Sequence, residues 1–172
     1  MQNLNYGVIG NCSTAALISE KGAIEWLCFP EFDSPSVFAA ILDRQKGGHF
    51  GFKVTSDYKV TQSYVPHTNI LSTHFESEEG AFDVVDFMPC YPTSDGKDFY
   101  RPAEIYRYIR WAKGRPRMKV DYRPAPNYAR GKTIYNVTSQ YVETYSSVEN
   151  KDRQYLYSSL DLKKVVNHDE IT

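Results

Sequence analysis

Apolar and polar side chains alternate along much of this chain, and a period of two predicts β-strands. Segment 117–123 shows the pattern most clearly, because Met118, Val120 and Tyr122 would share one face and the charged residues the other. Comparable patterns occupy residues 14–19, 24–28, 49–54, 58–64, 69–76, 81–87, 105–111, 132–138, 140–146 and 154–160. Strands at this spacing, separated by glycine-containing turns, predict a mainly β fold, an antiparallel sandwich of two sheets.

Residues 34–43 depart from this pattern. Ser34 is a candidate helix cap, Pro35 suits a first helical turn, and mostly good helix formers follow. We therefore expect one short helix near residues 35–43, which Gly47 and Gly48 would end.

The two ends of the chain are less regular. Residues 7–11 lack the third glycine of a dinucleotide-binding fingerprint, so we interpret them as a turn between strands. Residues 163–172 show neither a clear closing strand nor a polar tail, and we expect a longer protein to have been cut there. A length of 172 residues corresponds to one domain over residues 1–172.

Composition narrows the class of protein. A net charge of −1 argues against nucleic-acid binding, and no apolar run is long enough to cross a membrane. The N-terminus lacks the features of a signal peptide, and Cys12, Cys28 and Cys90 have neither disulfide-framework nor zinc-site spacing. We therefore expect a cytoplasmic protein with reduced thiols, no metal site and no cofactor.

Aromatic residues are abundant, with 14 Tyr, 9 Phe and 2 Trp in a chain of mean hydropathy −0.52. They suit half-buried β-sheet faces or a sugar-binding surface. The densest group lies between Trp26 and Asp33. Trp26, Phe29 and Phe32 are either core residues or a platform for a sugar ring, and Asp33 suits a turn.

A pair of carboxylates about 5–9.5 Å apart would indicate glycoside hydrolysis. Asp83 and Asp86 are three residues apart on one predicted strand, which places them on opposite faces. Glu31 and Asp33 lie in a predicted turn. The sequence therefore supplies no catalytic residues, and we expect the isolated chain to be inactive.

Three stretches together resemble a known family. The most specific is the run from Trp26 to Ser36. Two further stretches corroborate it, residues 64–71 with 85–89 and residues 107–110 with 118–128. Over about residues 5–130 the chain is similar to the N-terminal domain of prokaryotic glycoside hydrolases of family fifteen, the glucoamylase-like and trehalase-like enzymes.

This resemblance implies a large β-sandwich packed against a separate (α/α)6 barrel, which carries both catalytic carboxylates and hydrolyses an α-glucosidic bond with inversion. The barrel is absent from this chain. The resemblance thus implies a noncatalytic domain whose partner is the catalytic barrel of the same protein, with Trp26, Phe29, Phe32 and Asp33 as candidate contacts to that barrel or to substrate.

Two alternatives remain open from the sequence. The exposed tyrosines would bind an α-glucan or trehalose directly in a carbohydrate-binding module. A purely structural assembly domain would instead form a symmetric dimer.

Overall fold

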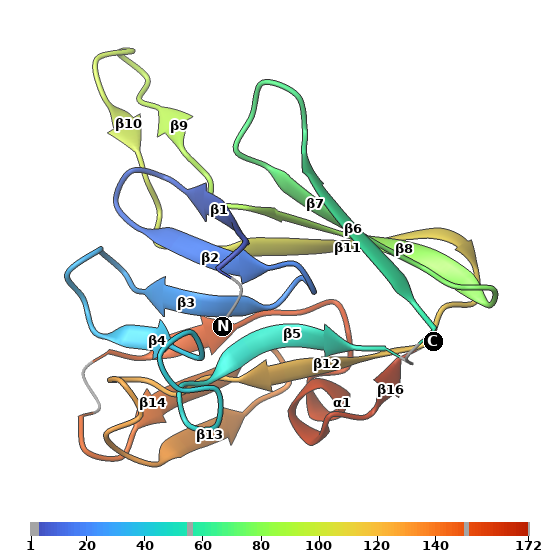
Figure 1. Cartoon of the computed structure of the whole chain (residues 1–172). Coiled ribbons are helices and arrows are strands. Elements are labelled where there is room, and N and C mark those ends of the chain that lie inside the picture. The colour runs from blue at the N-terminus through green and yellow to red at the C-terminus, as the bar shows by residue number, and fades with distance from the viewer. Residues whose placement is uncertain (1–3, 55–56, 150–151, 172) are drawn as a thin grey trace.

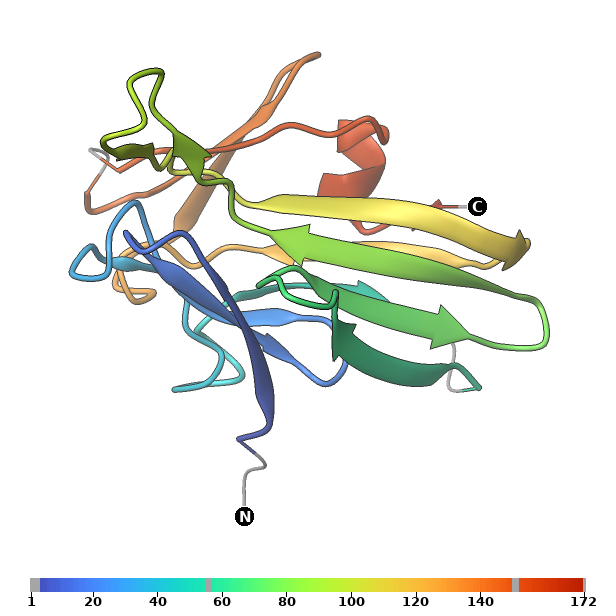
Figure 2. The ribbon, with the colours of Figure 1, turned by 90° about the horizontal axis from the view of Figure 1, so that it is seen from above.

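The computed structural model describes residues 4–54, 57–149 and 152–171 and shows an antiparallel β-sandwich (Figures 1 and 2). One sheet has the strand order β1–β2–β3–β5–β12–β16, with the short β4 beside β3. Its strands are β1 (Tyr6–Gly10), β2 (Ala15–Ser19), β3 (Ile24–Cys28), β4 (Ser36–Phe38), β5 (His49–Lys53), β12 (Met118–Arg123) and β16 (Glu170–Ile171). We call it the first sheet.

The second sheet has the order β11–β8–β7–β6 and covers the inner face of the first. Its strands are β6 (Lys59–Tyr64), β7 (Leu71–Glu76), β8 (Gly80–Phe87) and β11 (Tyr106–Gly114). The buried core lies between the sheets, where Ile18 and Ile24 from the first meet Phe75, Phe82 and Val84 from the second. The fold class predicted from the sequence is therefore confirmed.

Smaller elements extend the sandwich. Strands β13 (Thr133–Val137), β14 (Val142–Ser146) and β15 (Gln154–Leu156) form a separate sheet, and β9 (Tyr91–Pro92) pairs with β10 (Phe99–Tyr100). Helix α1 (Leu162–Asn167) buries Leu162 and Val165, and Val165 joins the core. Figure 1 shows β13, β14 and α1 on the β12 side of the molecule, with β9 and β10 projecting from one end.

A buried ion pair ties the two large sheets together. Arg107 on β11 donates two hydrogen bonds to Asp86 on β8, at 2.8 and 3.0 Å, and their side chains are only 4% and 0% exposed. The same guanidinium donates to the backbone oxygens of Phe50 and Gly22, which belong to the first sheet and its β2–β3 turn. Arg107 lies on the same face of β11 as Ile109, so a charged side chain stands where the alternation of the strand places apolar ones. The hydrogen bonds to Asp86, Phe50 and Gly22 offset the cost of burying that charge.

Strand β1 forms the outer edge of the first sheet, and a side chain from the second sheet occupies that edge. The Tyr64 hydroxyl accepts a hydrogen bond from the Val8 N–H at 2.7 Å and donates one to the Val8 carbonyl at 2.9 Å. Both backbone groups of Val8 are thereby satisfied on the side where β1 has no neighbouring strand.

The prediction of a short helix near residues 35–43 is wrong. Ser36–Phe38 is strand β4, whose three residues are all buried beside β3, and turns follow it. The Ala39 N–H donates to the Gly47 carbonyl, and a Cβ at Gly47 would lie 2.2 Å from the Ala39 oxygen. Tertiary pairing overrides local helix propensity here.

Both ends of the chain also differ from expectation. Residues 7–10 belong to strand β1 and do not form a turn, because Ile9 is fully buried in the core. Residues 162–167 form α1, which Asp161 caps by accepting hydrogen bonds from the Lys163 and Lys164 N–H groups. Strand β16 then closes the first sheet by pairing with β12. Within the described ranges, no helix is long and apolar enough to cross a membrane.

Candidate functional site

The structure divides the residues that the sequence singled out between Trp26 and Asp33. Phe29 is half-buried and packs against the core, and Trp26 is half-buried with its ring centroid 6.5 Å from that of Tyr128. Phe32 is 62% exposed and Asp33 is also exposed, in the turn that follows β3. Only Phe32 and Asp33 are therefore presented outward in the way a contact surface requires.

The turn between β3 and β4, which contains Phe32, lies at the end of the sandwich from which β9 and β10 project (Figure 1). The Phe32 N–H donates to the Ser13 carbonyl in the β1–β2 loop, and the buried Asn11 of that loop donates to the Pro102 carbonyl just after β10. Hydrogen bonds thus join three connections at this end. The exposed aromatic residues of the turn after β3 and of strands β9 and β10 define what we call the aromatic end: Phe32, Tyr91, Phe99 and Tyr100.

The four side chains of the aromatic end have exposed fractions from 51% to 63%. Exposed apolar groups gathered together mark interaction sites more often than scattered ones do. The sequence pointed to Phe32 but not to Tyr91, Phe99 and Tyr100, because residues 92–96 read only as a loop. One aromatic residue before that loop and two after it were the available signal.

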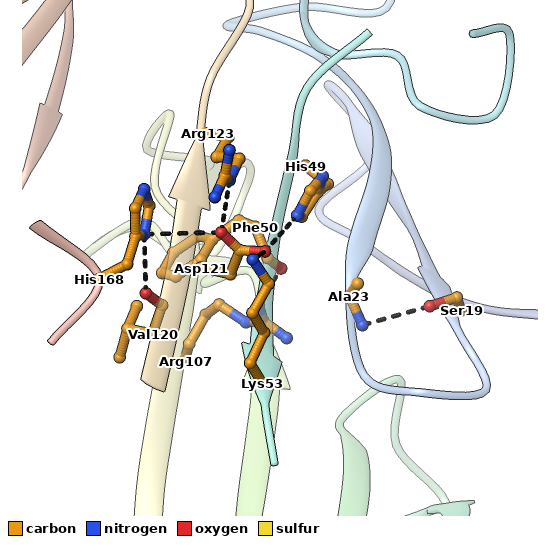
Figure 3. A network of polar contacts seen from close by, with 10 residues as sticks. All are labelled: Ser19, Ala23, His49, Phe50, Lys53, Arg107, Val120, Asp121, Arg123 and His168. Atoms are coloured by element: carbon orange, nitrogen blue, oxygen red, sulfur yellow. Dashed lines mark hydrogen bonds and ion pairs between the residues drawn. The ribbon is translucent and has the colours of Figure 1, made fainter. Parts of the chain in front are cut away.

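A second candidate site surrounds Asp121 on β12 (Figure 3). Its carboxylate accepts hydrogen bonds from Arg123 Nε at 2.6 Å and His49 Nε2 at 2.8 Å, and forms ion pairs with Lys53 Nζ at 3.0 Å and His168 Nδ1 at 3.5 Å. The Asp121 side chain is 5% exposed. β5, β12 and the residue that ends α1 therefore converge on one carboxylate.

Burial raises the pKa of the Asp121 carboxyl, but hydrogen bonds from Arg123, His49 and Lys53 outweigh it and hold that pKa well below its ordinary value. Asp121 is thus a fixed negative charge that holds cationic side chains in place. The sequence missed it because the alternation along β12 placed Asp121 on a charged face that was expected to lie in solvent.

The loop after β12 adopts a rare backbone conformation. Asn127, Tyr128 and Ala129 have φ angles of 56°, 54° and 56°, in the left-handed region. This conformation costs roughly 1–2 kcal/mol per non-glycine residue, so surrounding contacts must hold it. The Tyr128 ring packs against Trp26, and Asn127 donates to Glu149 at 3.1 Å. Ala129 of this loop lines the same hollow as Asp121.

The carboxylates on β8 lie on opposite faces, as predicted. Asp83 accepts hydrogen bonds from His74 at 2.6 Å and Arg110 at 2.7 Å on the outer face of its sheet, whereas Asp86 points into the core toward Arg107. The two do not flank a common space, so they do not form an acid–base pair.

Asp121→Asn is expected to lower the free energy of unfolding at pH 7 by about 1–2 kcal/mol. This loss is kept small because Lys53 and Arg123 are about half exposed, so solvent screens their attraction to Asp121. A depressed folded-state pKa gives stability that is present above the unfolded pKa of about 4 and is lost as the pH falls below it. Urea unfolding between about pH 6 and pH 3 should therefore show a shallower acid loss in Asp121→Asn than in the unmodified chain. Asp33→Asn, in an exposed turn, is the matched control. Equal pH slopes for Asp121→Asn and the unmodified chain would contradict the assignment.

Fold and surface together define an antiparallel β-sandwich domain with an aromatic end and a cationic site around Asp121. Residues 5–150 match the model of the family described as trehalase-like, N-terminal, and the chain belongs to this family. The chain is therefore an N-terminal domain of the trehalase-like glycoside hydrolase class.

Several relatives are named trehalases. The chain is 36% identical over 132 residues to the trehalase of Thermoplasma volcanium, covering 75% of this chain and 20% of the relative. It is 33% identical over 155 residues to the trehalase of Thermoplasma acidophilum, covering 88% and 26%. Trehalase 1 of Sulfolobus acidocaldarius is 51% identical over 85 residues, covering 48% and 14%. The chain therefore spans about a fifth to a quarter of the length of the first two relatives, and no solved structure matches it.

Proposed function

We propose that this chain is the noncatalytic N-terminal sandwich domain of a trehalase-type hydrolase of α-glucosides. The observation that carries the proposal is the match of residues 5–150 to the trehalase-like N-terminal family in a chain that covers 20% and 26% of two trehalases. The placement of Asp83 and Asp86 on opposite faces of β8 supports a noncatalytic role, because they do not share a substrate-sized space.

The same proposal assigns the domain a partner, the catalytic (α/α)6 barrel of the whole protein. The aromatic end is the surface best suited to contact that barrel, since Phe32, Tyr91, Phe99 and Tyr100 expose large apolar area. Burying aromatic side chains of this kind is a main source of affinity in protein interfaces. At the mouth of the barrel, such a contact would also shape the access of substrate.

The first test is an assay for glucose released from trehalose and from maltooligosaccharides. We expect the purified 172-residue chain to release none above buffer, while the full-length Thermoplasma acidophilum trehalase serves as positive control. Turnover that co-purifies with the chain would contradict the noncatalytic assignment. In the whole protein, preference for maltooligosaccharides over trehalose would indicate the glucoamylase type.

The second test concerns the barrel contact. Co-expressing the chain with the catalytic barrel of the whole protein should give a complex that co-purifies, and Phe99→Ser with Tyr100→Ser should weaken it at least about tenfold. Tyr157→Ser is the control, because Tyr157 is 68% exposed but follows β15, outside the aromatic end. Equal loss in both variants would place the contact elsewhere.

Two further expectations stay predictions. A direct α-glucan site gains no specific support, because exposed tyrosines are spread over the molecule. Tyr64 and Tyr108 lie on the two opposite edge strands of the second sheet, and Tyr155 lies on β15. The cytoplasmic location accords with Cys12, Cys28 and Cys90, each a free thiol in the structure.

A further inference from the structure

A hollow beside Asp121 has four cationic side chains among the residues that line it. Its volume is about 450 Å³, and it lies between the turn before β5, strand β5 itself, and the segment that joins β12 to β13. The charged groups on its wall are Arg44, Lys46, His49, Lys53, Asp121 and Arg123.

The charge balance of this hollow is strongly positive. Two arginines and two lysines line it against the single carboxylate of Asp121, which leaves a surplus of three positive charges when His49 is left out of the count. Asp43 lies in the same turn as Arg44, and its carboxylate accepts hydrogen bonds from the Gln45 and Lys46 N–H groups. Counting Asp43 as well still leaves a surplus of two.

The geometry also leaves donors available. Arg123 donates to Asp121 through Nε. The two terminal nitrogens of its guanidinium therefore make no hydrogen bond to Asp121 and can face a ligand. Lys53 contacts Asp121 with one ammonium group that carries three N–H donors. Among the residues the structure describes, Arg44 and Lys46 form no ion pair within 4 Å, and both are exposed at the rim.

We propose that this hollow binds a small ligand through a doubly charged phosphoryl group. A surplus of two or three positive charges suits a dianion better than a monoanion, and guanidinium groups bind phosphate oxygens in pairs. The volume falls within the range of small-molecule sites and accommodates a phosphate carried on a sugar. Asp121 acts as a positioning residue that holds Lys53 and Arg123 toward the ligand.

Calorimetric titration of the purified chain tests this proposal directly. We expect saturable binding tighter than about 1 mM for inorganic phosphate or glucose 6-phosphate, and none for glucose or acetate. Tighter binding of glucose 6-phosphate identifies a phosphorylated sugar as the ligand, whereas equal affinities identify the free anion. Added salt should weaken the binding, because exposed charges are screened.

The variant Arg44→Gln with Lys46→Gln should weaken phosphate binding at least tenfold without affecting the fold, since both side chains are exposed and lie outside the Asp121 ion pairs. Lys21→Gln, in the β2–β3 turn, is the control for a lost surface cation. Amide NMR shifts give an independent readout, with changes expected at Gly48 and Gly131 beside the hollow but not at Gly96 in the β9–β10 loop. No saturable binding of either phosphate compound, equal affinity in the double variant, or shifts confined to other regions would overturn the proposal.

Discussion

Arg107→Ala should destabilise the domain by about 3–5 kcal/mol, because it leaves the Asp86 carboxylate buried without its partner. The Asp86 side chain is 0% exposed, and its two oxygens accept hydrogen bonds from the same guanidinium. The substitution also removes the donors to the Phe50 and Gly22 carbonyls, so two oxygens of the first sheet lose a hydrogen bond. Guanidinium denaturation followed by circular dichroism measures the loss.

Arg110→Ala is the matched control for Arg107→Ala. Arg110 lies on the same strand and pairs with Asp83, but its side chain is 64% exposed, so its loss should cost less than about 1 kcal/mol. Replacing both partners, with Arg107→Met and Asp86→Leu, should destabilise less than Arg107→Ala alone, because no unpaired charge remains buried. If Arg107→Ala costs no more than Arg110→Ala, the pair does not join the sheets energetically.

Phe82→Ala should destabilise the domain by a similar amount, about 3–5 kcal/mol, through loss of apolar contacts and the cavity it leaves. Phe82 is fully buried and stacks on Phe75 with ring centroids 4.6 Å apart. Phe52 of the first sheet packs edge-on against both rings, at 6.2 and 6.3 Å, so the site has little freedom to collapse. The same denaturation experiment measures this effect.

Phe32→Ala provides the comparison for Phe82→Ala, because it removes the same side chain from a position that is 62% exposed. Its expected change in the free energy of unfolding is within about 0.5 kcal/mol. A large cost at Phe32 would show that it packs within the domain and would argue against its place in the aromatic end. A small cost at Phe82 would contradict the packing of the two sheets described above.

The strands were largely predictable from the sequence, because the alternation of apolar and polar residues is a local signal of one buried face. On β12, Met118, Val120 and Tyr122 are all buried, as the pattern indicated. The failure at residues 36–38 has a different origin. Strand β4 is buried along its whole length, so it shows no alternation, and only its pairing with β3 distinguishes it from a helix.

The candidate sites were less predictable, because they depend on which distant segments meet. The sequence indicated Phe32 and Asp33 correctly as turn residues, but it gave no means of separating them from the packed Trp26 and Phe29. The surroundings of Asp121 include His49 and Lys53 of β5 and His168 at the end of α1, which are far from Asp121 in the sequence. No spacing along the chain reports that arrangement.

The hydrogen bonds of the Tyr64 hydroxyl affect how readily molecules of this protein associate through the edge strand β1. An unpaired edge strand offers N–H and C=O groups on which a strand of another molecule can add, and this is a common route to aggregation. In β1 the two backbone groups of Val8 already bond to Tyr64, and the bulky ring stands beside them. A single tyrosine from the opposite sheet thus occupies, at Val8, the two backbone groups that an added strand would need.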